Sequence, residues 1–146
     1  MNLKTWAENG WLRPHQTNRQ QVIDLLAIVE RDLQDSERDI SIDWQFGIAY
    51  NAALKLCTIL LYASGYRPEK NLAHYRTLQA LPLIMGHEHD DNADYLDACR
   101  AKRNTAEYDA VGTVSRSESV ELHDFTCQLH TDVLTWLKLN HPTLCP

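Results

Sequence analysis

The 146-residue sequence has few of the residues that interrupt regular structure, with only five glycines and five prolines. It contains no Gly/Ser-rich linker, no low-complexity tract and no internal repeat, and its length fits one domain. Apolar and polar residues nowhere alternate over a long run, and β-branched residues are scattered, so no convincing strand is found. The sequence therefore predicts a single domain over residues 1–146 without a sheet.

Basic residues are also scarce, because 14 Lys and Arg stand against 20 Asp and Glu, for a net charge of −6. This balance argues against a broad basic surface of the kind that most nucleic-acid-binding domains carry. It leaves room for a local basic patch. Any RNA bound by this protein is therefore expected to contact it through few phosphates.

Signatures of export, membrane insertion and common catalytic motifs are missing as well. Residues 1–15 lack an apolar stretch and carry Glu8, so we do not expect a signal peptide. The most apolar run, residues 44–66, is interrupted by Asn51 and Lys55 and predicts a buried helix, not a membrane span. There is no Cys-x-x-Cys pair, no Gly-rich phosphate loop and no Gly-x-Ser-x-Gly motif. We expect a cytoplasmic protein with reduced, mostly buried cysteines and no cofactor.

Helical signals, in contrast, are abundant. A helix over 17–33 is expected to start with a Thr17–Gln20 capping box, and the last helix with a Ser115–Glu118 capping box. Pro82 is expected to kink or end another helix early. Short connections between amphipathic helices favour an all-α fold, an antiparallel up-and-down bundle of five to six helices. A short N-terminal helix within residues 1–15 precedes the bundle. The other expected helices cover about 42–64, 71–85, 91–110 and 115–140.

One helix breaks the separation of polar and apolar residues in the stretch CRAKRNTAEYD, residues 99–109. The apolar stripe of this helix consists of Leu96, Cys99, Ala106 and Ala110. At 100° per residue, Arg103 falls inside that stripe. A buried, unpaired guanidinium costs several kcal/mol, so Arg103 must pair internally, line a cleft or face a partner subunit. Glu107, one turn later, is the expected internal partner.

Asn104 and Tyr108, also one turn apart, flank the stripe and extend the polar patch. One interpretation is a structural network that fixes the register of the helix. The other is a cleft in which Arg103 binds an anionic group, since a guanidinium matches the geometry of a phosphate. Tyr108 would then add a stacking face or a hydroxyl donor. Spacing alone does not decide between these interpretations.

Further basic and amide side chains could complete such a cleft. Arg100 and Lys102 lie on the same helix, and Asn51 and Lys55 are one turn apart in the most apolar helix. These four side chains are candidates, with Arg103 and Asn104, for binding RNA or a nucleotide. In the competing interpretation Lys55 extends to the surface and Asn51 bonds a neighbouring residue.

Two groups of residues contain metal-binding side chains without a recognised metal motif. His87–Asp91 lacks the His-Glu-x-x-His pattern and is expected to form an acidic loop at a helix N-terminus. His123, Cys127 and His130 share one face of the last helix, where a structural role is expected. We predict no metal site, and a metal-dependent enzyme using His87 and His89 is the weakest alternative.

The stretch CRAKRNTAEYD, in a small acidic helical chain, resembles the HEPN superfamily, named for nucleotide-binding domains of higher eukaryotes and prokaryotes. That family carries Arg followed by a polar residue, and then a His, on a late helix of an up-and-down bundle. Arg103 and Asn104 match the start of the motif, and Tyr108 occupies the His position. The resemblance implies a homodimer in which two motif helices meet. It also implies RNA or nucleotide binding and a cognate antitoxin or nucleotidyltransferase as partner.

Many members of the family are metal-independent ribonucleases, in which the His performs acid–base chemistry and the Arg binds the phosphate. By resemblance, Arg103, Asn104 and Tyr108 are the candidate catalytic residues. A general base works best with a pKa near the ambient pH, and tyrosine, at about 10, is poorly suited. We therefore expect a binding or regulatory protein, in a toxin–antitoxin or stress-response system. The alternatives are a non-catalytic homodimeric module with a structural Arg103 patch and, less favoured, a metal-independent endoribonuclease.

Overall fold

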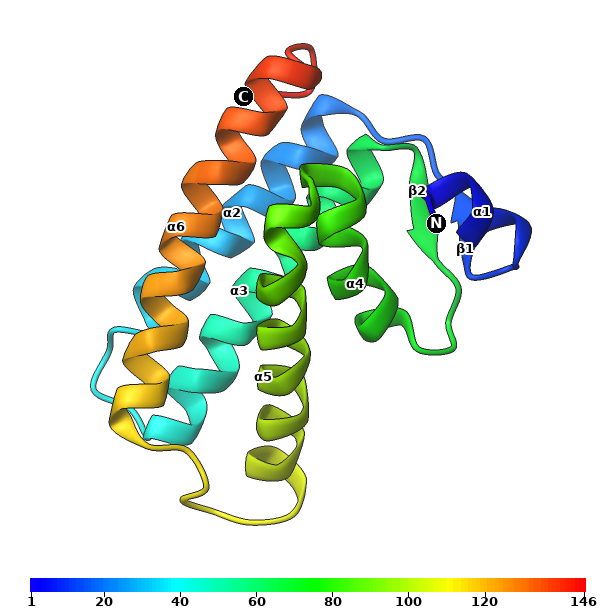
Figure 1. The fold of residues 1–146 in the computed structure, drawn as a ribbon. Helices are drawn as coiled ribbons and strands as arrows, with labels where there is room; N and C mark the ends of the chain where they lie inside the picture. Colours follow the sequence, from blue (N-terminus) through cyan, green and yellow to red (C-terminus); the bar gives the residue numbers. More distant parts are fainter.

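The computed structural model describes residues 1–146 and confirms the prediction of an all-α bundle of five to six helices (Figure 1). The helices are α1 (Leu3–Glu8), α2 (Arg19–Asp35), α3 (Ile42–Ala63), α4 (Ala73–Met85), α5 (Asp90–Tyr108) and α6 (Arg116–Asn140). A one-turn 3₁₀ helix, η1 (His87–His89), leads into α5, and two short strands are β1 (Leu12–Pro14) and β2 (Tyr66–Pro68).

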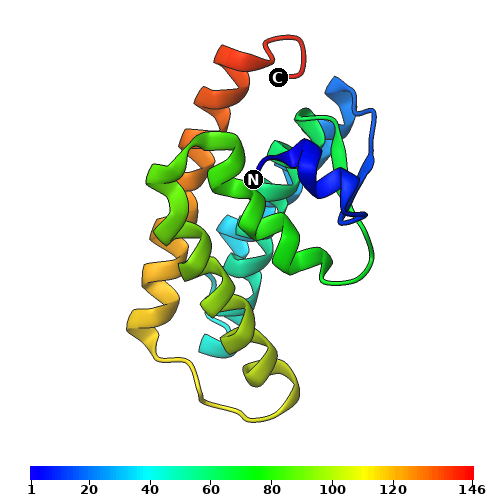
Figure 2. The same ribbon diagram turned by 45° about the vertical axis from the view of Figure 1, so that its right-hand side comes forward.

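Helix α3 is the centre of the bundle. Figures 1 and 2 show it enclosed by α2, α4, α5 and α6, and each of these four helices packs against it. Its length and composition would suit a membrane span, but 72% of its most apolar 18-residue window is buried inside the protein. Thirteen of its 22 residues are buried, and eleven of these belong to the main core of 24 residues. The apolar residues of α3 are thus buried by the neighbouring helices.

Of the two predicted capping boxes, the one at the start of α6 is present and the one at the start of α2 is not. The Ser115–Glu118 capping box at the start of α6 is present, with both reciprocal hydrogen bonds formed. The box predicted at Thr17 is wrong, because Asn18 is the N-cap of α2 and accepts from the Gln21 amide at 2.8 Å. Asn is as effective an N-cap as Ser or Thr, so the neighbouring residue competes successfully.

Pro82 was expected to kink α4 or to end it early, and it does not end the helix. Helix α4 continues to Met85, and the carbonyl of Pro82 accepts from the Gly86 amide at 2.9 Å. The start of α4 also falls later than residue 71, because Leu72 adopts a left-handed conformation with φ 57°. Only one turn follows Pro82, so few hydrogen bonds depend on the position that it disturbs.

The expectation of a chain without strands is wrong in one small region. β1 and β2 pair antiparallel, with Arg13 opposite Arg67 (Figure 1). A strand of three residues is too short for alternation of apolar and polar residues to reveal it. The pairing depends on Gly65, whose positive φ of 94° reverses the chain after α3. An ion pair between Arg13 and Glu69 further joins the two segments.

The N-terminal segment is attached through a second, smaller apolar cluster. This cluster consists of Trp6, Leu12, Leu61 and Ala80, and therefore links α1 and β1 to α3 and α4. The guanidinium of Arg76 lies 3.8 Å from the centre of the Trp11 ring, which suits a cation–π contact. The short N-terminal helix thus packs on the side of the bundle where α4 begins.

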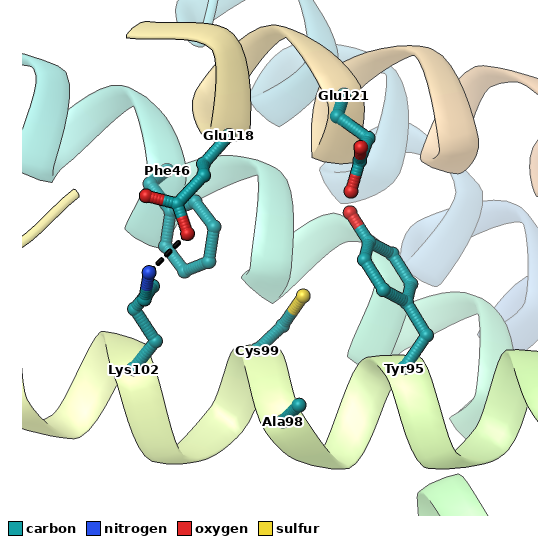
Figure 3. A pocket seen from close by; sticks show the side chains of 7 residues that line it. All are labelled: Phe46, Tyr95, Ala98, Cys99, Lys102, Glu118 and Glu121. Atoms are coloured by element: carbon teal, nitrogen blue, oxygen red, sulfur yellow. Dashed lines mark hydrogen bonds and ion pairs between the residues drawn. The ribbon is translucent and has the colours of Figure 1, made fainter. Parts of the chain in front are cut away.

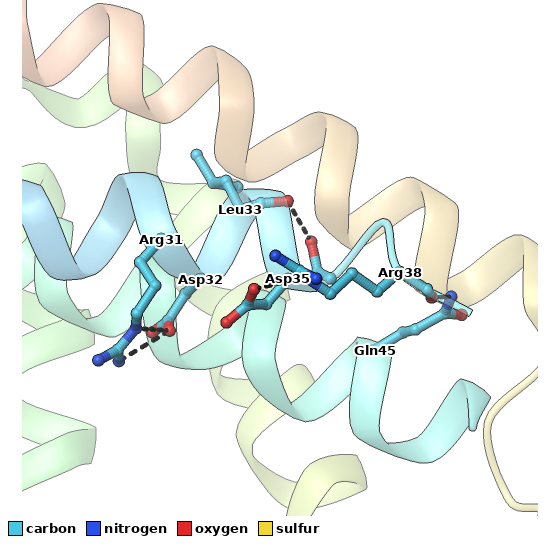
Figure 4. A network of polar contacts seen from close by, with 7 residues as sticks. Arg31, Asp32, Leu33, Asp35, Arg38 and Gln45 are labelled. Carbon is cyan, nitrogen blue, oxygen red and sulfur yellow. Dashed lines mark hydrogen bonds and ion pairs between the residues drawn. The ribbon is translucent and has the colours of Figure 1, made fainter. Parts of the chain in front are cut away.

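Polar side chains hold the end of α2 and the turn that leads to α3 (Figure 4). Arg31 pairs with Asp32 at 2.9 Å, and Arg38 pairs with Asp35 at 2.8 Å. The amide of Gln45 donates to the carbonyl of Arg38 at 2.8 Å, which ties the turn to the first part of α3. Of these contacts, the Gln45 hydrogen bond is the one that reaches α3.

All four cysteines are free, and the two in α3 and α5 behave as the small buried hydrophobic residues that the sequence predicts. Burial raises the pKa of the Cys57 thiol to about 12 and that of the Cys99 thiol to about 11. Cys127 is only partly buried, and its pKa is raised by the same cause. Cys145 is partly buried too, and its carbonyl accepts from Arg19 Nε at 3.3 Å.

A glycine inside α3 gives a test of how closely α3 and α5 pack. A methyl group at Gly47 would lie 3.5 Å from Glu107 Oε1 and 3.9 Å from Arg103 Cγ, which are ordinary contact distances. Glycine in a helix interior costs about 0.5–1 kcal/mol relative to alanine. We therefore expect Gly47→Ala to raise the free energy of unfolding by up to about that amount in urea titrations. A loss of stability would mean that the helices approach more closely than described.

Candidate anion-binding site

Arg103 lies on the face of α5 that packs against α3, as its position in the apolar stripe predicts. Its side chain is 23% exposed, and its guanidinium carbon lies 5.6 Å from the centre of the Tyr50 ring. Gly47 of α3 lies beside the Arg103 stem and Glu107. The guanidinium is thus held between an aromatic ring and the edge of the bundle.

Glu107 is the partner of Arg103, as expected, but the pairing is incomplete. Arg103 Nε lies 3.1 Å from Glu107 Oε1, and the Nη1 group donates to Asn104 Oδ1 at 3.2 Å. The Nε–H bond is not directed at the carboxylate, so buried Nε has no hydrogen-bond acceptor despite this short distance. The geometry therefore gives attraction between charges without satisfying the donor.

The hydroxyl of Tyr50 is a second buried polar group without a hydrogen-bond partner. Burial raises the pKa of Tyr50 strongly, while the positive charges of Arg103 and Arg100 act in the opposite direction. Tyr50 is consequently a neutral donor at all physiological pH values. An unsatisfied buried polar group costs about 1–3 kcal/mol, so two beside each other mark a site where an acceptor would be stabilised.

Basic side chains of α3 and α5 act electrostatically on one residue of α4, His74. Partial burial lowers the pKa of His74, and the charges of Arg103, Lys55 and Arg100 lower it further, in that order. Arg100 is paired with Asp97 at 2.8 Å, whereas Lys55 has no ion-pair partner in the chain. We call Lys55, His74, Arg100 and Arg103 the basic cluster. In a chain of net charge −6, such convergence of cations is a local feature.

The structure brings only part of the predicted set into this cluster. Asn51 Nδ2 donates to Asp32 Oδ2 on α2 at 2.7 Å, as in the structural interpretation of this residue. Lys102 is about 100° around α5 from Arg103 and pairs with Glu118 of α6 (Figure 3). His74 was not predicted, because its position near Arg103 results from the packing of α4 and leaves no signal in local spacing.

Lys102 lines a separate pocket of about 200 Å³ between α5 and α6, together with Cys99 and Tyr95 (Figure 3). Its ammonium group is the main cause that lowers the pKa of Glu118 to about 2. Burial raises the pKa of Tyr95, and the nearby carboxylate of Glu121 adds to this effect. The Cys99 thiol and the Tyr95 phenol are protonated, and Lys102 is paired with Glu118. The pocket therefore contains no activated nucleophile.

Tyr108 lies apart from the Arg103–Asn104 contact. It is five residues after Arg103, about 140° around the helix, and is 75% exposed. It lines a pocket with Trp44 and Val111 at the end of α5. The structure therefore joins Asn104 to Arg103 by a hydrogen bond and leaves the residue in the His position of the HEPN-like motif outside the basic cluster.

The two histidine-containing groups make local polar contacts. His87 Nδ1 lies 3.3 Å from Asp90 Oδ1, and His89 Nδ1 lies 3.0 Å from Asn92 Nδ2. On α6, His123 Nδ1 lies 2.7 Å from Ser36 Oγ. No three His, Cys, Asp or Glu side chains in the chain come together in an arrangement that could hold a metal ion.

No protein-family model matches the chain, and no curated protein or solved structure shows significant similarity to it. The proposed function is therefore based on the fold and on the geometry of the site. The HEPN resemblance stays a prediction, based on residues 99–109 and on the bundle architecture.

The basic cluster can be tested through the pKa of His74. Arg103→Met and Lys55→Met each remove a positive charge that lowers this pKa, so each is expected to raise it. Because the pKa of folded His74 lies below its unfolded value, stability is reduced as the pH falls below about 6.5, and both variants should lessen that reduction. NMR titration of the histidine ring protons measures the shift. Lys138→Met, on an exposed last turn of α6, is the matched control; an unchanged His74 pKa in all three variants would refute the cluster.

Proposed function

We propose that this protein is a HEPN-like binding domain that holds a phosphate-bearing ligand, an RNA or a nucleotide, at its basic cluster. The main support is that the charges of Lys55 on α3 and of Arg100 and Arg103 on α5 all act on His74 of α4, in an otherwise acidic chain. Arg103 Nε and the Tyr50 hydroxyl are buried donors without acceptors, and the Arg103 guanidinium carbon lies 5.6 Å from the centre of the Tyr50 ring.

A phosphate suits this cluster because it supplies several acceptor oxygens and a negative charge at once. A guanidinium donates to phosphate in a bidentate manner, and Lys55 adds a point charge with no competing partner. The cluster is small, so the ligand is expected to engage one or two phosphates. This favours a nucleotide or a short single-stranded RNA segment over a long duplex, and it implies a modest dependence on salt.

Binding is favoured over cleavage by the position of Tyr108. A general base must reach the proton that it abstracts, and Tyr108 lies outside the cluster with an exposed ring. A regulatory binding role fits this separation. The resemblance then places such a domain beside a cognate antitoxin or nucleotidyltransferase, in a toxin–antitoxin or stress-response system.

A metal-independent endoribonuclease is the second candidate function, and one observation supports it. His74 is a titratable group within the basic cluster whose lowered pKa leaves it neutral at pH 7, as a general base requires. If the protein cleaves RNA in the presence of EDTA, we expect His74→Gln to abolish cleavage and Tyr108→Phe to leave it unchanged. The reverse result would assign acid–base chemistry to Tyr108.

The binding proposal predicts a specific pattern of affinity losses. A charge-assisted hydrogen bond contributes about 1.5–3 kcal/mol, so Lys55→Ala and Arg103→Ala should each weaken binding about tenfold or more. Fluorescence anisotropy with labelled oligoribonucleotides and with a labelled nucleotide, at low salt, measures the affinity. Circular dichroism and thermal melting confirm that each variant is folded. Lys138→Ala should bind like the wild type.

The competing class is a homodimeric interaction module in which the Arg103–Glu107 pair is structural. Sedimentation of the wild type and Arg103→Met separates the two. If no probe binds the wild type at low salt and Arg103→Met changes the dimer mass or melting temperature, the patch is a structural network. Wild-type binding that survives both Lys55→Ala and Arg103→Ala would place the ligand elsewhere.

A further inference from the structure

A second surface feature lies where α3 begins and α5 ends, at the same end of the bundle (Figure 1). A pocket of about 480 Å³ is lined there by Trp44, Tyr108 and Val111, three of the eight exposed large apolar residues of the chain. Trp44 is 59% exposed and Tyr108 75% exposed. Large aromatic rings at the rim of a hollow, left uncovered by the chain, are typical of a surface that binds a partner.

The charges in this pocket are all negative. Asp43 and Glu107 line it, and no Lys, Arg or His does. Glu107 is compensated by Arg103 at 3.1 Å. Asp43 is not: its Oδ2 accepts from the Gly112 amide at 3.1 Å, and its buried Oδ1 has no hydrogen-bond partner. A carboxylate with one oxygen buried and unpaired is stabilised most by a donor that also carries positive charge.

We propose that this pocket binds an arginine side chain from a basic segment of a partner protein. The planar guanidinium stacks on the Trp44 and Tyr108 rings and donates hydrogen bonds to the carboxylate of Asp43. Charge complementarity supports this occupant, because Asp43 is the one charged residue of the pocket without a compensating ion pair, and its charge is negative. A lysine fits less well, since its ammonium group neither stacks as a plane nor donates in a bidentate manner.

A nucleobase is the main competing occupant, because exposed aromatic rings also stack on bases. The carboxylates count against it, since Asp43 repels the phosphate that a nucleotide would bring. The arginine pocket adjoins the basic cluster through Glu107, which pairs with Arg103. The proposal for this pocket does not require that the basic cluster binds a phosphate.

The test uses three short peptides that differ in one side chain: acetyl-Gly-Arg-Gly-amide, its lysine analogue and its neutral citrulline analogue. Each is titrated at millimolar concentration into the full-length protein, and the indole N–H resonance of Trp44 is followed by NMR. Trp44→Phe identifies that resonance among the four tryptophans. We expect the arginine peptide to shift it with an affinity at least tenfold higher than that of the citrulline peptide, and the lysine peptide to be intermediate.

Variants of the pocket decide which groups are responsible. Tyr108→Ala removes one stacking face from an exposed position and should weaken binding of the arginine peptide about twofold to fivefold. Asp43→Asn should remove the preference for arginine over citrulline. Val120→Ala, an exposed apolar residue on α6, is the control and should bind like the wild type. If Asp43→Asn does not fold, the arginine-to-citrulline ratio of the wild type and the Tyr108→Ala result still decide.

Two results would overturn the assignment. Equal shifts with the arginine and citrulline peptides would show that the pocket does not select for charge. A larger effect of guanosine or adenosine monophosphate on the Trp44 resonance than of the arginine peptide would make it a nucleobase site.

Discussion

The need to bury α3 from every side determines the rest of the structure. Burying a leucine or isoleucine side chain contributes about 1.5–3 kcal/mol, and α3 carries several that are fully enclosed. Because its apolar residues do not fall on one stripe, no single neighbour could cover it. Four helices therefore pack around it, and polar residues of α3 make contacts with two of them. Asn51 meets α2 in this way, and Tyr50 meets Arg103 of α5.

The sequence predicts best what depends on local periodicity. The helical class, the central position of α3, the Ser115 cap, the inward position of Arg103 and its pairing with Glu107 all follow from spacing along one helix. Predictions of where a helix begins or ends were less accurate. Asn18 displaces Thr17 as a cap, and Pro82 lies too near the end of α4 to terminate it.

Features made by contacts between distant segments could not be predicted from spacing. The pairing of β1 with β2 joins residues more than 50 positions apart, over strands too short to carry a pattern. His74 joins the basic cluster through the packing of α4, and Lys102 leaves the predicted set because α6 supplies Glu118. The pocket around Trp44 likewise combines the start of α3 with the end of α5.

Glu107 lines the Trp44 pocket and also pairs with Arg103 of the basic cluster. An anion that competes for Arg103 therefore also alters the charge of this pocket.

The buried thiols of Cys57 and Cys99 differ in how they are kept from an oxidant. Oxidation and disulfide exchange require a thiolate that an oxidant can reach, and both residues are buried and protonated. Packing around α3 encloses the Cys57 sulfur, whereas Cys99 lines the pocket between α5 and α6 and is kept as a thiol by its raised pKa. Of the two, Cys57 is thus the thiol that the packing itself keeps from an oxidant.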